Sequence, residues 1–282
     1  MVADDLKGLQ TVFEFTAIER EFGRFLCRLA GREAPLLPEL GALLLRQINE
    51  GHSCLDLKLW RENTLKMLEQ EKIRLRILRE TGSDGTALRT TLQKLSADDL
   101  AVRVCGLARE FPQLFAQSLE RKTPLIWLDE GNRLYLHRYY ACEQDIAQWI
   151  RKSLEAEEDL FSPEEIRSAH DYFRNSQDAP DYQQLAVALA LKQRFAIITG
   201  GPGTGKTTVL AVILGLLLQR HPEYRISLAA PTGKAKARMQ EAISSGVSQL
   251  HLPETVTSRL LELQAQTVDS LIGHHPEAVR PW

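Results

Sequence analysis

The sequence predicts an α/β protein: a mostly helical N-terminal domain with a small β-hairpin, followed by a domain that contains parallel strands. Two patterns carry this prediction. Apolar residues recur at three- and four-residue spacing through much of residues 5–162, as is typical of helices packed on a core. After residue 181, short apolar runs alternate with helical segments, as is typical of the parallel βαβ unit.

Composition places the chain among ordinary globular proteins. Its 282 residues are 44% hydrophobic and 26% charged, which suffices for the cores of one large or two ordinary domains. The net charge of −2 shows no basic excess, so nucleic-acid binding would have to come from a local patch. No apolar run approaches the roughly 18–20 residues of a membrane span. The sequence therefore predicts no membrane contact.

The four cysteines predict neither a zinc site nor a disulfide framework. They are Cys27, Cys54, Cys105 and Cys142, and they lack the Cys-x-x-Cys and His spacings of metal ligands. Scattered free thiols suit a reducing compartment. Because the N-terminus also lacks a signal-peptide pattern, we expect a cytoplasmic protein.

Three helices are predicted from local signals in the N-terminal part. The first carries apolar residues at helical spacing between positions 13 and 29. A second covers residues 57–79, which are rich in Leu, Lys, Glu and Arg and are followed by a glycine-containing turn. Ser96 has the position of an N-cap, with acidic residues in the turn that follows.

A β-hairpin is predicted between residues 125 and 136. Two short apolar runs, at 125–128 and 133–136, flank a turn that contains Gly131 and Asn132. A helix is expected over residues 140–154. The acidic run at 155–159 is then typical of a linker, and residues 162–165 fit a capping box with proline at the first helical position. We therefore expect an N-terminal domain over 1–155, a linker with a capping helix over 156–180, and a second domain over 181–282.

The second domain is predicted to begin with a βαβ unit. Residues 183–191 are helical in pattern, and 195–199 form a short apolar run that leads directly into glycines. A helix rich in Leu and Val is expected over 206–220, a second strand over 226–230, and another helix from about Lys234.

The glycines belong to a P-loop, the pattern G-x-x-x-x-G-K-[ST]. Glycines let backbone N–H groups approach phosphate oxygens, and the N-terminus of the following helix favours an anion. Lys206 can reach the β- and γ-phosphates, and the Thr207 hydroxyl can bind Mg²⁺. A glycine-rich turn without a ligand is the alternative, which the strand-loop-helix context disfavours. The predicted phosphate-site residues are Gly200, Gly201, Pro202, Gly203, Thr204, Gly205, Lys206, Thr207 and Thr208.

Segments around the P-loop follow one another at the spacing of superfamily-1 DNA helicases. They are QQLAVALA at 183–190, IITGGPGTGKTT at 197–208 and LAAPTGKA at 228–235. In these segments the chain resembles the RecD family, the alpha subunits of exodeoxyribonuclease V in the RecBCD complex. Upstream, GHSCLDL at 51–57 resembles the GHVCLPL type of segment in the family's N-terminal domains, and residues 124–150 resemble the segment before its linker.

The resemblance implies a RecA-like motor domain, incomplete here, over residues 181–282. It implies ATP and Mg²⁺ as cofactors, with Gln183 reading the adenine edge. It implies that single-stranded DNA contacts a second group of residues, Pro231, Thr232, Gly233, Lys234 and Thr267. Asp269 stands where the family usually has His, which weakens the implied contact at Thr267. RecB-like and RecC-like subunits are the implied partners.

Parts of a complete helicase motor are missing from this sequence. No strand ending in Asp-Glu follows the P-loop, and no second motor domain is present. We therefore expect the front part of an ATP-dependent DNA helicase subunit of 5′-to-3′ polarity, acting in double-strand break repair, which binds nucleotide but hydrolyses it poorly and binds DNA weakly. An assembly module, whose N-terminal domain docks a partner and whose P-loop only binds nucleotide, is the alternative. A clamp-loader type of ATPase is disfavoured by the Pro-Thr-Gly-Lys segment.

Overall fold

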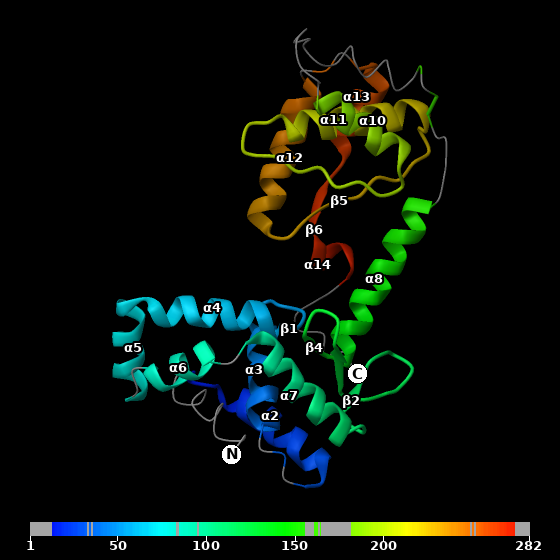
Figure 1. The fold of residues 1–282 in the computed structure, drawn as a ribbon. Helices are drawn as coiled ribbons and strands as arrows, with labels where there is room; N and C mark the ends of the chain where they lie inside the picture. Colours follow the sequence, from blue (N-terminus) through cyan, green and yellow to red (C-terminus); the bar gives the residue numbers. More distant parts are fainter. Residues whose placement is uncertain are drawn as a thin grey trace. The chain divides into compact units, whose positions relative to one another are not determined.

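The computed structural model describes residues 13–32, 34, 36–82, 85–94, 96–155, 161–162, 164, 182–248, 250 and 252–273. The chain divides into two compact units, Met1–Ala147 and Gln148–Trp282, which are treated separately below (Figure 1). This division falls inside one long helix. The expected linker and capping helix at 156–180 lie almost wholly outside the described residues, so the predicted domain boundaries stay a prediction.

Helices dominate the N-terminal unit. They are α2 (Ala17–Ala30), α3 (Leu37–Asn49), α4 (Leu57–Glu69), α5 (Glu71–Thr81), α6 (Thr86–Lys94), α7 (Ala97–Glu110) and the start of α8 (His137–Glu155). The predicted first helix and the Ser96 N-cap are confirmed, since Ser96 accepts a hydrogen bond from Asp99 N at 3.0 Å. The single helix predicted over 57–79 is wrong: it breaks at Gln70, whose backbone is extended.

The sheet of the N-terminal unit contains the predicted hairpin. Its strands are β1 (Leu55–Asp56), β2 (Phe115–Ala116), β3 (Leu125–Leu128) and β4 (Arg133–Leu136), in the order β1-β4-β3-β2. β3 and β4 pair antiparallel, with Leu128 opposite Arg133 next to the turn. Gly131 and Asn132 have φ values of 94° and 54°, which explains why the turn uses these two residue types. Trp127 and Phe111 are fully buried in the core beside the sheet.

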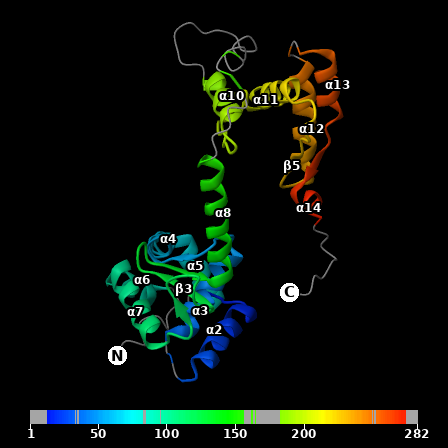
Figure 2. The same ribbon diagram turned by 90° about the vertical axis from the view of Figure 1, so that its right-hand side faces the viewer.

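The C-terminal unit is built around α11 (Lys206–Arg220). The other elements are α10 (Tyr182–Lys192), β5 (Leu228–Ala230), α12 (Gly233–Ser248), α13 (Glu254–Glu262), β6 (Ala265–Thr267) and α14 (Val268–Leu271). One side of α11 packs on α10, and the other packs on α12 and α13, in a core that also contains Leu228 of β5. Both views show α11 meeting one end of α12, with α14 near the other end (Figure 2). The predicted helices of the βαβ unit and its second strand are confirmed.

The strand predicted over 195–199 is wrong. This segment forms no strand, and Ile197 is 74% exposed. A strand is defined by hydrogen bonds to a neighbour, and none of the described strands pairs with it. The two strands that do pair are β5 and β6, which run parallel with Ala230 opposite Thr267. The α/β class with parallel strands is therefore confirmed, although the strands differ from those expected.

Candidate nucleotide-binding site

The P-loop ends at an uncapped helix N-terminus. Gly203 and Gly205 have φ values of 76° and 79°, a left-handed conformation that glycine adopts at little cost. Gly205 is the N-cap of α11, and no side chain caps this helix. The first backbone bond of the helix is donated by Val209 N to Gly205 O, at 3.0 Å. The N–H groups of residues 206–208 therefore lack an acceptor within the helix and are available to an anion.

Lys206 lies folded onto the loop that precedes it. Its Nζ donates to Gly200 O at 2.6 Å and also to Gly201 O. Thr204 Oγ1 donates a hydrogen bond to Gly201 O at 3.0 Å, and this bond stabilises the same turn. The ammonium group therefore lies at the loop, where phosphate oxygens could take the place of the carbonyl oxygens as its acceptors. Pro202 is exposed in the same turn.

Gln183 lies against the P-loop, although it stands 17 positions before Gly200 in the sequence. Its Nε2 donates to Thr204 O at 3.0 Å. A Cβ atom on Gly205 would lie only 2.3 Å from the same Nε2, so the absence of a side chain at Gly205 makes room for the amide. The structure therefore brings Gln183 to the loop, as the resemblance implies. Its reading of adenine stays a prediction.

Gly205→Ala is expected to weaken nucleotide binding about tenfold more than Gly203→Ala does. Both changes place a side chain at positive φ, which costs about 1–2 kcal/mol, but only the one at Gly205 also displaces Gln183. Gly203 has open space around it and is the matched control. Titration with a fluorescent ATP analogue measures the difference. In a Gln183→Ala background the difference should largely vanish; a difference that persists there would rule out the Gln183 contact as its cause.

The predicted DNA-contact residues gather at one edge of the β5–β6 sheet. Because Ala230 pairs with Thr267 in a parallel ladder, the carboxyl ends of both strands lie together. Thr232 Oγ1 accepts a hydrogen bond from Ala235 N, and Thr267 Oγ1 accepts one from Ser270 N, each at 3.2 Å. Both hydroxyls thus cap a following helix. The remaining members of the group, Pro231, Gly233 and Lys234, are exposed, as are Lys236 and Arg238 on α12.

The two groups of predicted residues are not brought together. The sheet edge adjoins Gly233 at the start of α12, whereas the contact between α12 and the start of α11 is at Gly246. At about 1.5 Å per residue, the helix between these two glycines is about 20 Å long. The structure therefore has a phosphate-type site and a separate basic edge, joined by α12.

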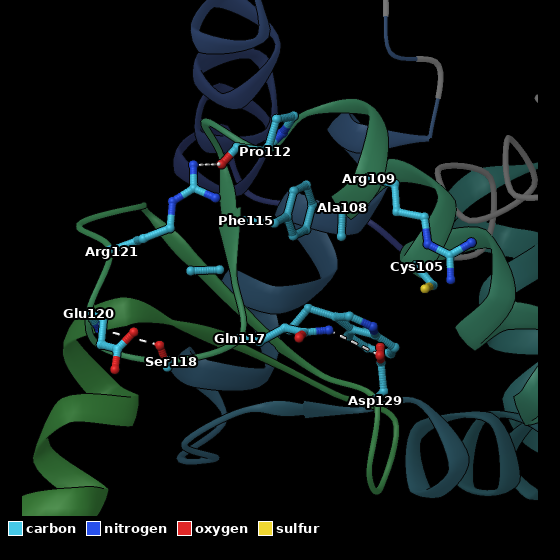
Figure 3. A pocket seen from close by; sticks show the side chains of 12 residues that line it. Cys105, Ala108, Arg109, Pro112, Phe115, Gln117, Ser118, Glu120, Arg121 and Asp129 are labelled. Atoms are coloured by element: carbon cyan, nitrogen blue, oxygen red, sulfur yellow. Dashed lines mark hydrogen bonds between the residues drawn. The ribbon is translucent and has the colours of Figure 1, made fainter.

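A polar pocket in the N-terminal unit was missed by the sequence reasoning. This Trp127 pocket, of about 360 Å³, lies between α7, β3 and the segment after β2. Figure 3 shows Arg109 and Arg121 on opposite sides of Phe115. Arg121 Nη2 donates to Pro112 O at 2.9 Å, whereas Arg109 has no ion pair or hydrogen bond within the described residues. The residues come from separate elements, so no local sequence pattern marks the pocket.

The GHSCLDL segment lines another pocket, of about 250 Å³. Ser53 Oγ donates to Glu143 Oε1 at 2.6 Å, and Asp56 pairs with Arg133. Burial, the largest cause, raises the pKa of the Cys54 thiol and of the Tyr135 phenol, which lie in contact. Both groups are therefore neutral at pH 7. Within the described residues, no three His, Cys, Asp or Glu side chains gather as a metal site.

Family comparisons match both units. Residues 14–135 match the model described as "RecBCD enzyme subunit RecD, N-terminal domain", and residues 183–280 match an AAA domain. The chain is 39% identical over 152 residues to the RecBCD enzyme subunit RecD of Mycolicibacterium smegmatis, an alignment that covers 52% of this chain and 26% of that protein. The RecBCD enzyme subunit RecD of Mycobacterium tuberculosis is 31% identical over 258 residues, 90% of this chain and 38% of that protein.

The chain is thus similar to RecD proteins in both of its units. The predicted resemblance is therefore confirmed. A third relative, the ATP-dependent RecD2 DNA helicase of Deinococcus radiodurans, is 30% identical over 155 residues, 52% of this chain and 18% of that protein. The alignments thus span 18% to 38% of the length of these three RecD-type relatives. No helix within the described residues has the length and apolar character needed to cross a membrane.

Proposed function

We propose that this chain is a member of the RecD family, binds ATP and Mg²⁺ at its P-loop and forms part of an ATP-dependent DNA helicase subunit. The observation that carries this proposal is the uncapped N-terminus of α11 with Lys206 folded over the adjacent glycines. An open helix N-terminus beside an ammonium group binds polyphosphate. The AAA domain match and the name of the Deinococcus relative support the same activity.

Within this proposal each residue of the site has one task. The N–H groups at 206–208 and the loop glycines hold the phosphates, and Lys206 neutralises the β- and γ-phosphates. Thr207 supplies a hydroxyl ligand to Mg²⁺, and Gln183 reads adenine through its amide. Magnesium, if held by the Thr207 hydroxyl, would offset the negative charge of the phosphates. The P-loop residues and Gln183 would hold the nucleotide, but none of them is assigned to orient an attacking water. We therefore propose that these residues alone hydrolyse ATP slowly.

Thr207→Val is expected to make nucleotide affinity nearly independent of Mg²⁺. Valine keeps the shape of the side chain but has no hydroxyl, so the loop should still bind the phosphates without a protein ligand for the metal. Isothermal titration with ATP, in Mg²⁺ and in EDTA, measures the ratio of the two affinities. Thr207→Ser should keep the wild-type ratio. An unchanged ratio in the valine variant would contradict the assignment of Thr207.

We also propose that single-stranded DNA binds the basic edge at Thr232, Lys234 and Thr267, with the 5′-to-3′ polarity that the resemblance implies. The carboxyl ends of β5 and β6 lie together here, beside exposed lysines, and such an edge could bind the phosphates of a DNA backbone. RecB-like and RecC-like subunits would be partners in a cytoplasmic complex that acts in double-strand break repair and recombination; the names of the Mycolicibacterium and Mycobacterium relatives support this role.

An assembly module is the second candidate function, and the Trp127 pocket favours it. Arg109 lines this pocket and has no ion pair or hydrogen bond within the described residues, so its guanidinium group could donate to an acidic segment of a partner. Binding of labelled oligo(dT) separates the two candidates. A helicase part should bind it with an affinity that falls steeply as salt rises, whereas a pure assembly module should not bind it.

A further inference from the structure

The Trp127 pocket is enclosed by segments of the N-terminal unit that lie far apart in the sequence. Arg109 comes from the last turn of α7, Phe115 from β2, residues 117–121 from the segment after β2, and Asp129 from the hairpin turn. The volume of about 360 Å³ is at the lower end of the range for ligand pockets. The pocket therefore suits a small ligand or the end of a peptide.

The lining of the pocket carries charges of both signs. Arg109 and Arg121 lie on opposite sides of Phe115 (Figure 3). Glu120 and Asp129 also line the pocket, so the formal charges of the arginines and the acids cancel. A polyanion such as DNA would be repelled by the two acids, whereas a ligand with a single anionic group could bind at the arginines. The charges therefore favour a ligand with one negative group.

Arg109 is available to bind such a group. It is exposed in the last turn of α7 and has no ion pair or hydrogen bond within the described residues. The neighbouring acid, Glu110, is already paired with Arg32 of α2 at 3.1 Å. Arg121 donates to Pro112 O, and it keeps its full charge because a carbonyl oxygen does not neutralise it. A carboxylate would bind these guanidinium groups through charge-assisted hydrogen bonds.

The other walls of the pocket offer an apolar surface and hydrogen-bond acceptors. Ala108, Phe115 and Ala116 form the apolar part. Gln117 Nε2 donates to Asp129 Oδ2 at 3.1 Å, which leaves the Gln117 amide oxygen and the second Asp129 oxygen without a donor within the described residues. A ligand that complements all of these walls carries a carboxylate, an apolar group and an N–H group close together.

We propose that the Trp127 pocket binds the C-terminal residue of a partner protein, with the terminal carboxylate at Arg109 and Arg121. A terminal residue has its carboxylate, its side chain and its N–H on one Cα atom, whereas an internal acidic residue uses its side chain for the carboxylate and leaves the apolar wall uncovered. The apolar last side chain would lie on that wall, and its N–H would donate to Asp129. This site rests on the docking of a partner in the second candidate function, and it specifies the chemical group that is recognised.

Labelled peptides that differ only at the last residue test this site. Each common amino acid stands last in turn, with either a free carboxylate or an amide at the end, and fluorescence polarisation measures affinity for the full chain. Peptides with an apolar last residue should bind best. The amide should weaken their binding about tenfold, because a charge-assisted hydrogen bond is lost. Arg109→Gln should abolish this preference for the carboxylate.

Arg79→Gln is the matched control. Arg79 is also an exposed arginine in the last turn of a helix of the N-terminal unit, α5, and has no ion pair or hydrogen bond within the described residues. It does not line the Trp127 pocket. This variant loses the same charge and should keep the wild-type preference for the carboxylate. A thermal melt checks that both variants are folded, as expected for exposed side chains.

A carboxylate preference that Arg109→Gln abolishes and Arg79→Gln keeps supports the site. Equal binding of carboxylate and amide by the wild-type chain overturns it, as do a lack of binding by any peptide and a preference that persists in Arg109→Gln. Competition by oligo(dT), or by an amidated peptide with an internal aspartate, would also overturn it, because the pocket would then take a polyanion or an acidic segment. Titration of the same preparation with Mg-ATP tests the nucleotide site in the other unit, so a failure of either site is seen separately.

Discussion

Lys206→Ala is expected to weaken Mg-ATP binding by about 100-fold. The ammonium group makes the charge-assisted hydrogen bonds to phosphate, each worth about 1.5–3 kcal/mol, and alanine leaves only the loop N–H groups. Within the described residues this group donates to Gly200 O and Gly201 O, both at the exposed loop, so its removal should leave the fold intact. Equilibrium titration with a fluorescent ATP analogue, alongside a thermal melt, measures both effects.

Lys192→Ala is the control for this prediction. Lys192 is the last residue of α10 and is exposed. Its replacement by alanine removes the same charge from the same unit at a position outside the P-loop. Its affinity for Mg-ATP should stay within about twofold of wild type. If both variants lose affinity equally, a diffuse effect of charge explains the loss and the P-loop assignment is wrong. If neither loses affinity, the loop does not bind triphosphate at all.

The phosphate site could be predicted from sequence because its chemistry is local. Nine consecutive residues supply the positive-φ glycines, the helix N-terminus and the ammonium group, so one motif specifies the whole arrangement. Gln183 needed the family resemblance, since a lone glutamine on a helix carries no local signal. Only the structure shows its bond to Thr204 O.

The predictions from sequence were wrong where the structure depends on contacts with segments far away in the chain. The apolar run at 195–199 has the composition of a strand, but strand pairing is a contact with other segments and no local pattern supplies it. The break at Gln70 interrupts a run of good helix formers, so propensity alone could not locate it. The glycines that lie close to another segment are the contacts that are hardest to predict from sequence. Nothing near Gly246 or Gly23 in the sequence indicates which segment packs against either residue.

Gly23 makes the closest such approach and carries the largest expected effect on stability. It lies on α2 where this helix crosses α3, and a Cβ atom there would lie 2.2 Å from Pro38 O. The obstacle is backbone, which cannot rotate away as a side chain would. Gly41 faces the same crossing, with Gly23 Cα 3.1 Å from where its own Cβ would be. The fully buried Leu26 and Leu37 pack beside this contact.

Gly23→Ala should therefore lower the free energy of unfolding of the N-terminal unit by about 3 kcal/mol, because α2 and α3 must separate and expose apolar surface. Urea unfolding followed by tryptophan fluorescence measures it, since Trp60 and Trp127 lie in this core. Gly106→Ala makes the same chemical change on α7 in open space, and should be neutral or slightly stabilising because alanine is the better helix former. Equal stability of the two variants would mean that the α2–α3 crossing is looser than a direct backbone contact, and a different pair of surfaces would then have to hold these helices together.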